Sequence, residues 1–67
     1  MEYVLTENQK PECGAEVIIV VRRGTRLNYY LATYEGGPYF DAEGRLFAVK
    51  SVVAWMLVPK YEEVIQD

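Results

Sequence analysis

The stretch Val17-Ile18-Ile19-Val20-Val21, followed by Arg22-Arg23-Gly24-Thr25-Arg26, decides the fold class of this chain. Residues 17–21 are β-branched throughout, and the run is too short for a typical helix, so it predicts a strand covered on both faces. Residues 27–34 are rich in Tyr and Leu and predict a second strand, because Gly24-Thr25 supplies the turn between the two. The sequence therefore predicts a β-hairpin.

The register of this hairpin decides which side chains face the core. A two-residue loop at Gly24-Thr25 would place Arg23 opposite Arg26, and a pair of like charges costs up to about 1 kcal/mol. We therefore expect a three-residue bulged loop. This loop predicts a core face made of the pairs Val21 with Tyr29, Ile19 with Leu31, and Val17 with Thr33.

The same register predicts a mixed second face on the hairpin. Its residues are Glu16, Ile18, Val20, Arg22, Asn28, Tyr30, Ala32 and Tyr34. Four of them would form an apolar patch fringed with hydroxyl groups, and we take that patch as the candidate partner-binding site: Ile18, Val20, Tyr30 and Tyr34. Tyrosine is enriched in binding surfaces, although it is also a good strand former that packs across sheets.

The rest of the chain predicts further β-structure. Residues 7–14 have loop composition, and Asp41 to Gly44 suit a type I turn that closes a second hairpin. Residues 49–58 fit a strand better than a helical stripe, and residues 61–65 could form one helical turn. We expect one domain over residues 1–67, mainly β, as a small antiparallel meander or a partly open SH3-like barrel.

A chain of this length buries a small core, so we expect that a large buried side chain and contact with another molecule stabilise the fold. We expect Trp55 to be buried, with its indole N–H bonded to a carbonyl and with Val17, Ile19, Leu31 and Val53 around it. Cys13 is the single cysteine, so no internal disulfide can form, and we expect its thiol to be buried or inert. A second copy or a bound partner is the remaining source of support.

The net charge and the composition restrict the classes of partner that this chain can bind. The net charge of −3 argues against general nucleic-acid binding, which depends on neutralising phosphates. The start of the chain lacks a secretory pattern, and no apolar run approaches membrane-spanning length. We therefore expect a cytoplasmic protein that does not engage membranes.

The sequence offers no catalytic constellation. Histidine is absent, which removes triads and imidazole acid–base chemistry. Gly36-Gly37-Pro38 is too short for a phosphate loop and lacks the following Lys-Ser or Lys-Thr. Asp41 and Glu43 supply far fewer oxygens than calcium prefers. We expect no enzyme activity, no metal and no cofactor.

A resemblance emerges from three segments. Pro11 precedes the strand at Glu16-Val17-Ile18-Ile19, Ala32-Thr33-Tyr34 lies centrally, and Val52 to Pro59 closes the pattern. Over roughly residues 8–59 the chain resembles domain-of-unknown-function family 551, whose members typically end in a Val-Thr-His-Trp-Met-Pro-Leu-Pro strand. Ala54 stands where the family's His precedes Trp, and Lys10 replaces an apolar residue before Pro11. The resemblance implies a phage, prophage or gut-bacterial setting and no established activity.

Two function classes remain open. The first is an accessory protein of phages or mobile elements that binds a protein partner, such as an inhibitor of a bacterial defence system, through the tyrosine-rich or acidic face. The second is a small-ligand or nucleotide module that uses Arg22, Arg23 and Arg26 for phosphates and Tyr30 or Trp55 for stacking. We favour the first, because a negative overall charge opposes phosphate capture.

Overall fold

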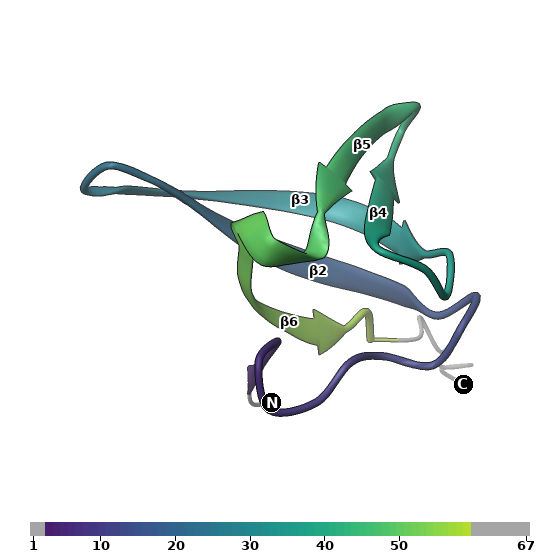
Figure 1. Cartoon of the computed structure of the whole chain (residues 1–67). Helices are drawn as coiled ribbons and strands as arrows, with labels where there is room; N and C mark the ends of the chain where they lie inside the picture. Colours follow the sequence, from purple (N-terminus) through teal and green to yellow (C-terminus); the bar gives the residue numbers. More distant parts are fainter. Residues whose placement is uncertain (1–2, 60–67) are drawn as a thin grey trace, which may run out of the picture.

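The fold is a six-stranded antiparallel sheet. A computed structural model describes residues 3–59. The strands run in the order β1-β6-β2-β3-β4-β5, and the only helical element in residues 3–59 is a single 3-10 turn, η1 (Figure 1). Their bounds are Val4–Leu5 for β1, Glu16–Arg23 for β2, Arg26–Tyr34 for β3, Tyr39–Ala42 for β4, Arg45–Ala48 for β5, Val49–Ser51 for η1 and Val52–Leu57 for β6.

The predicted mainly β, antiparallel fold is confirmed. Strands β2 to β5 follow one another by hairpins, and β6 returns to pair with the free side of β2. The sheet stays open, because β1 and β5 end it on its two sides. Residues 49–51 form η1, whereas residues 52–57 are strand as predicted. The helical turn predicted at residues 61–65 lies outside the described residues.

The hairpin of β2 and β3 has a different register from the predicted one. Gly24 and Thr25 form a two-residue loop, which sets Arg23 opposite Arg26, Val21 opposite Asn28 and Ile19 opposite Tyr30. Gly24 has a positive φ of 62° and Thr25 does not, which is the pattern of a type II′ turn. This turn matches the twist of the strands, and the arginine pair at its end is exposed to water, which weakens the repulsion.

The shift of one residue exchanges the faces of β3. Tyr34 and Ala32 are buried in the core, and Tyr30 packs against it, whereas Tyr29 and Leu31 are exposed. Leu31 was predicted to lie in the core, so that prediction is wrong. Side chains alternate along a strand, so one residue of register moves a whole set from one face to the other.

Trp55 is buried in the core, as predicted. It is only 6% exposed, Val17 and Ile19 beside it are fully buried, and its Nε1–H donates to the carbonyl of Gln9 at 2.8 Å. This hydrogen bond ties the long loop before β2 to β6. Val53 is exposed instead of buried, because the pairing of β2 with β6 shifts between Val20 and Val21 and leaves Val53 without an opposite residue.

The second hairpin forms where expected but with another turn. Ala42 pairs with Arg45, and Glu43 and Gly44 form the loop with φ of 54° and 87°. Two successive positive φ values define a type I′ turn and not the predicted type I. The Gly44 N–H donates to Oδ1 of Asp41 at 2.8 Å, so the Asp41 side chain holds the turn.

Candidate protein-binding face

The side of the sheet opposite the core carries a row of apolar side chains on β6, β2 and β3. We call this side the outer face and define it by the residues whose strand positions alternate with the core residues: Leu5, Ile18, Val20, Leu27, Tyr29, Leu31, Ala54 and Met56. Cross-strand pairing puts Met56, Ile18 and Leu31 in one row and Ala54, Val20 and Tyr29 in the next.

The side chain at the centre of the outer face is shielded from solvent within the single chain, whereas the side chains at its border are exposed. Val20 is 6% exposed although it lies outside the core cluster, because Tyr29 and Ala54 flank it across the strands. Tyr29 and Leu31 remain 58% and 55% exposed. A buried aliphatic centre bordered by exposed Tyr and Leu is the kind of apolar surface that partners cover.

Opposite charges lie at the two ends of the outer face. Arg22, on the outer side, lies near the hairpin tip and pairs with Leu27. At the other end, Glu16, Thr33 and Asp41 form a row across β2, β3 and β4. The face therefore has a basic end and an acidic end with apolar rows between them.

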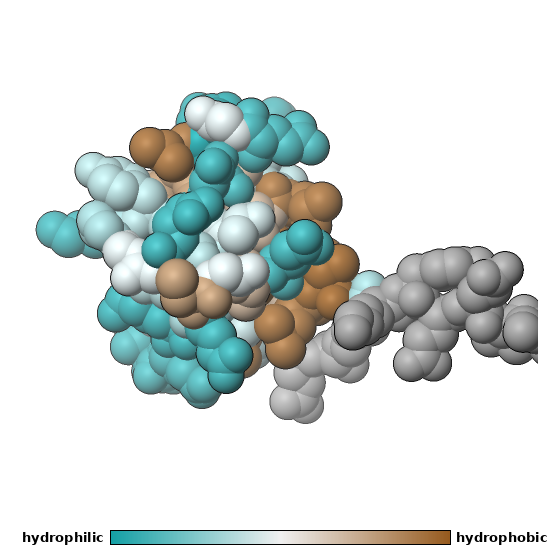
Figure 2. Space-filling model, turned by 90° about the vertical axis from the view of Figure 1, so that its right-hand side faces the viewer, coloured by the Kyte–Doolittle hydropathy of each residue, from teal (hydrophilic) through white to brown (hydrophobic). Residues whose placement is uncertain are grey.

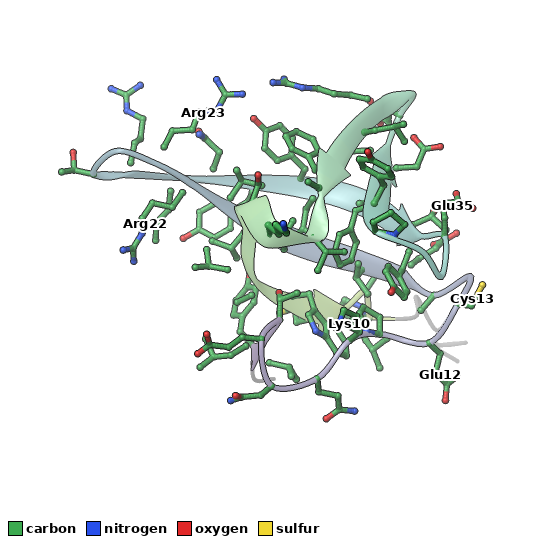
Figure 3. All side chains as sticks on the ribbon, viewed as in Figure 1. Lys10, Glu12, Cys13, Arg22, Arg23 and Glu35 are labelled. Atoms are coloured by element: carbon green, nitrogen blue, oxygen red, sulfur yellow. The ribbon has the colours of Figure 1, made fainter. Side chains whose placement is uncertain are left out.

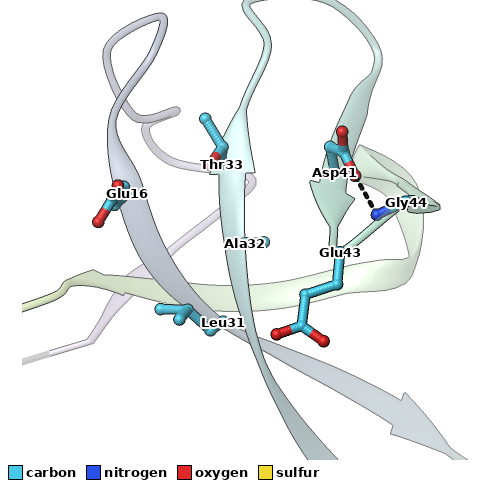
Figure 4. Close-up of a pocket in the computed structure, with 7 residues that line it drawn as sticks. All are labelled: Glu16, Leu31, Ala32, Thr33, Asp41, Glu43 and Gly44. Atoms are coloured by element: carbon cyan, nitrogen blue, oxygen red, sulfur yellow. Dashed lines mark hydrogen bonds between the residues drawn. The ribbon is translucent and has the colours of Figure 1, made fainter.

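A hollow of about 330 Å³ lies at the acidic end. Its lining combines three carboxylates with an apolar floor, and its residues are Glu16, Leu31, Ala32, Thr33, Asp41, Glu43 and Gly44. In Figure 4, Glu43 extends from the β4–β5 turn toward Leu31, whereas Glu16 lies on the other side of β3. Such a hollow suits the end of a lysine or arginine side chain from a partner.

No group of three or more His, Cys, Asp or Glu residues that could hold a metal ion is present in the part of the chain that the structure describes. Among residues 3–59 no helix is long and apolar enough to cross a membrane.

The four predicted partner-binding residues do not share a face. Ile18 and Val20 lie on the outer face, but Tyr34 is buried against Phe40, with ring centroids 5.0 Å apart. Tyr30 is half-buried against Phe47 at 4.6 Å. The sequence prediction missed Tyr29, Leu31 and Met56 as surface residues. The signal for Tyr29 and Leu31 was Gly24 at the first position of a two-residue loop, which fixes the register of β2 against β3.

The arginines lie at the hairpin tip but do not converge. Arg22, Arg23 and Arg26 are all exposed, and Arg23 pairs with Arg26 while Arg22 belongs to the other face. Figure 3 shows Arg22 and Arg23 pointing to opposite sides of the ribbon. The two rings predicted to stack on a nucleotide are already packed against other parts of the protein. Trp55 is buried in the core, and the Tyr30 ring packs against Arg45 and Phe47.

Features outside the outer face include a thiol and two lysines. Cys13 is exposed, which contradicts the buried alternative of the expected buried or inert thiol, and its Sγ lies 3.5 Å from the carbonyl oxygen of Glu35. Lys10 and Lys50 line two further hollows, of about 360 and 490 Å³.

Figure 2 views the end of the sheet that carries the loops beside β2 and β3, where hydrophobic and hydrophilic side chains adjoin at the surface.

Comparisons with known proteins give no relative: no family model, no curated protein and no solved structure matches the chain.

Proposed function

We propose that this chain is a non-enzymatic accessory protein of phages or other mobile elements, which acts in the host cytoplasm by binding a protein partner. The outer face carries the proposal: exposed Tyr29 and Leu31 border the buried Val20. Tyrosine and leucine side chains around a desolvated centre give affinity when a partner covers them. The absence of histidine from the sequence and the resemblance at Val52, Trp55, Met56 and Pro59 support the non-enzymatic, mobile-element part of the proposal.

The acidic hollow and the apolar rows of the outer face support a basic partner that also makes an apolar contact. An aliphatic or aromatic side chain of the partner would pack over Val20 between Tyr29 and Met56, while a lysine or arginine would enter the hollow at Asp41 and Glu43. Nucleic-acid-binding effectors of bacterial defence systems must present basic surfaces to phosphates. An acidic hollow beside an apolar face suits the inhibition of such an effector.

Affinity capture with matched variants tests the proposal. The wild-type chain, immobilised in host lysate, should retain a defined protein that mass spectrometry identifies, and Tyr29→Ser with Leu31→Ser should lose it. Tyr39→Ser is the control, because Tyr39 is also exposed but lines one of the lysine hollows. Equal capture by wild type and by the double variant would reject the outer face as the binding surface.

The nucleotide module remains the second proposal, and the same purified proteins test it. Arg23 and Arg26 lie side by side at the tip, so they could hold one phosphate between them. Binding of a fluorescent nucleotide that weakens with salt and disappears in Arg23→Ser with Arg26→Ser would favour this function over the first.

A further inference from the structure

Two lysines from distant parts of the chain line the same pair of hollows. Lys10 lies in the loop between β1 and β2, and Lys50 lies in η1. The smaller hollow has a volume of about 360 Å³ and the larger one of about 490 Å³, and Lys10, Val49 and Lys50 line both of them. The two hollows therefore adjoin at these three residues. Because a lysine side chain is long and flexible, both ammonium groups can serve either hollow.

Hydrogen bonds hold the backbone on both sides of the lysine hollows. On the loop side, the carbonyl of Gln9 accepts a hydrogen bond from Nε1–H of the buried Trp55 at 2.8 Å. On the η1 side, the N–H of Val49 donates to the carbonyl of Pro38 at 2.9 Å. The two lysines follow directly after Gln9 and Val49 in the sequence, so both side chains start from anchored backbone. A site that is formed before the ligand arrives lowers the entropy cost of binding.

The larger hollow combines positive charge with an apolar wall. Its lining consists of the two lysines with Pro38, Tyr39, Ala48 and Val49, and this lining, within residues 3–59, contains no acidic residue. The smaller hollow adds one carboxylate, that of Glu7. A negative charge is therefore favoured between the lysines on the side of the larger hollow, and it is disfavoured deeper in the smaller one.

The size of the larger hollow fits a small organic molecule. Sites for such molecules usually have volumes of about 300–1,000 Å³, and they pair an apolar lining with a few polar groups that fix the orientation of the ligand. An inorganic anion would leave the apolar wall uncovered, and a neutral apolar molecule would make no use of the lysines. A molecule that joins an anionic group to an apolar body uses both features.

We propose that the larger hollow binds a small organic anion, whose carboxylate or phosphate head lies between Lys10 and Lys50 and whose apolar body lies against Pro38, Ala48 and Val49. Each ammonium group can donate a charge-assisted hydrogen bond to an oxygen of the head. The body gains free energy because apolar surface leaves water.

The lysine site goes beyond the proposed function and does not depend on it. The lining of the larger hollow shares no residue with the outer face, with the acidic hollow or with the arginine tip. A bound anion therefore leaves Tyr29 and Leu31 open to a protein partner. It also stabilises the folded chain, because a ligand that binds only the folded state raises the melting temperature.

A titration followed by NMR tests the site on the full chain. Phenylacetate and phenyl phosphate are the probes, since each joins one anionic head to an aromatic ring. Acetate and inorganic phosphate carry the head alone, and benzyl alcohol carries the ring alone. We expect both probes to shift the amide signals of Lys10, Ala48, Val49 and Lys50 with saturation at millimolar concentration or below, and the three fragments to bind at least about tenfold more weakly. The probe with the lower Kd identifies the preferred head.

Removal of single charges, with a matched control, tests the two lysines. Lys10→Gln and Lys50→Gln should each weaken binding of the tighter probe about three- to fivefold, and the double variant should lose saturable binding. Arg22→Gln is the control, because it removes an equal charge at the hairpin tip and should leave the Kd nearly unchanged. All three side chains are exposed, so the variants should keep the native spectrum. Added salt should weaken binding to the wild type.

Three results would overturn the lysine site. They are the absence of saturable shifts with either probe, equal affinity of the wild type and the double lysine variant, and shifts confined to the amides of Thr25 and Arg26. The last result would place the anion at the arginine tip and would favour the nucleotide module. None of them touches partner capture through the outer face. Tyr29→Ser with Leu31→Ser should bind both probes like the wild type, so the two proposals fail separately.

Discussion

Arg23 lies directly opposite Arg26 across the Gly24-Thr25 turn. The chain accepts this pair of like charges because both side chains are exposed at the hairpin tip, where water screens them. The register that brings them together also turns Tyr30, Ala32 and Tyr34 toward the core. The burial gained over a whole strand outweighs a repulsion of about 1 kcal/mol or less.

Reversing one of these charges should stabilise the fold. Arg23→Glu replaces the repulsion by attraction to Arg26, so the free energy of unfolding should rise by about 0.5 kcal/mol at low ionic strength and lose that gain in high salt. Chemical denaturation at two salt concentrations measures the effect. Arg22→Glu is the control, since Arg22 lies opposite Leu27, and it should give no comparable gain.

The two tyrosines at positions 34 and 29 should differ sharply when each is truncated. Tyr34→Ala removes a buried ring that packs on Phe40, and the free energy of unfolding should fall by about 3–5 kcal/mol. Tyr29→Ala removes a mostly exposed ring and should cost about 1 kcal/mol or less. Thermal unfolding followed by circular dichroism compares them. Equal losses would contradict the observed register.

The indole of Trp55 should contribute through both packing and its hydrogen bond. Trp55→Phe keeps an aromatic ring but loses the bond to the carbonyl of Gln9, which then lies without a donor, so the expected cost is about 1–3 kcal/mol. Trp55→Ala should cost about 3–5 kcal/mol and leave a chain this small largely unfolded. Urea titration with tyrosine fluorescence reports both. A native-like Trp55→Ala protein would show that the core does not depend on the indole.

Two adjacent glycines should respond differently to alanine. Gly36 has a φ of 83°, and a Cβ there would lie 2.7 Å from Sγ of Cys13, so Gly36→Ala should destabilise the fold by about 1–3 kcal/mol. Gly37→Ala meets nothing within 4 Å and should change stability little. Melting temperatures of the two variants decide. Cys13→Ala combined with Gly36→Ala removes the contact with Sγ but keeps the Cβ of residue 13 and the positive φ, so it should recover only part of the loss.

A substitution at Glu43 should stabilise the turn between β4 and β5. Glu43 holds a φ of 54°, a conformation that asparagine adopts more readily than glutamate in a type I′ turn before glycine. Glu43→Asn should raise the free energy of unfolding by about 0.5–1 kcal/mol, and Glu43→Val should lower it. Denaturant midpoints measure both. If the acidic hollow binds a cationic side chain, Glu43→Asn should weaken that binding while it stabilises the fold.

Some residues were placed correctly from the sequence, and others were assigned to the wrong register or element. The β-branched run at residues 17–21 and Trp55 were placed correctly, because local propensity and core burial agree there. The register was wrong because one local repulsion, Arg23 with Arg26, was weighed against a turn preference without the burial of the full strand. Residues 49–51 left the strand because the chain turns as it passes from β5 to β6.

The prediction of the candidate site also depended on the register of β2 against β3. Ile18 and Val20 were assigned to the correct face because they alternate with the core residues of β2. Tyr30 and Tyr34 were assigned to the wrong one, since a strand with tyrosines at two successive positions, Tyr29 and Tyr30, fits either register. The acidic hollow joins residues from three strands and the β4–β5 turn, and no local pattern reveals such a set.

The sequence by itself determined where the longer strands lie, where the two hairpins turn and that Trp55 is buried, because these follow from β-propensity, glycine positions and the presence of a single tryptophan among apolar residues. The tertiary structure decided which tyrosines are buried, that Arg22 and Arg23 point apart, and that an acidic hollow forms beside β3. The reason is physical. A side chain's face depends on register, and register is set by the burial summed over all paired strands rather than by any one neighbour.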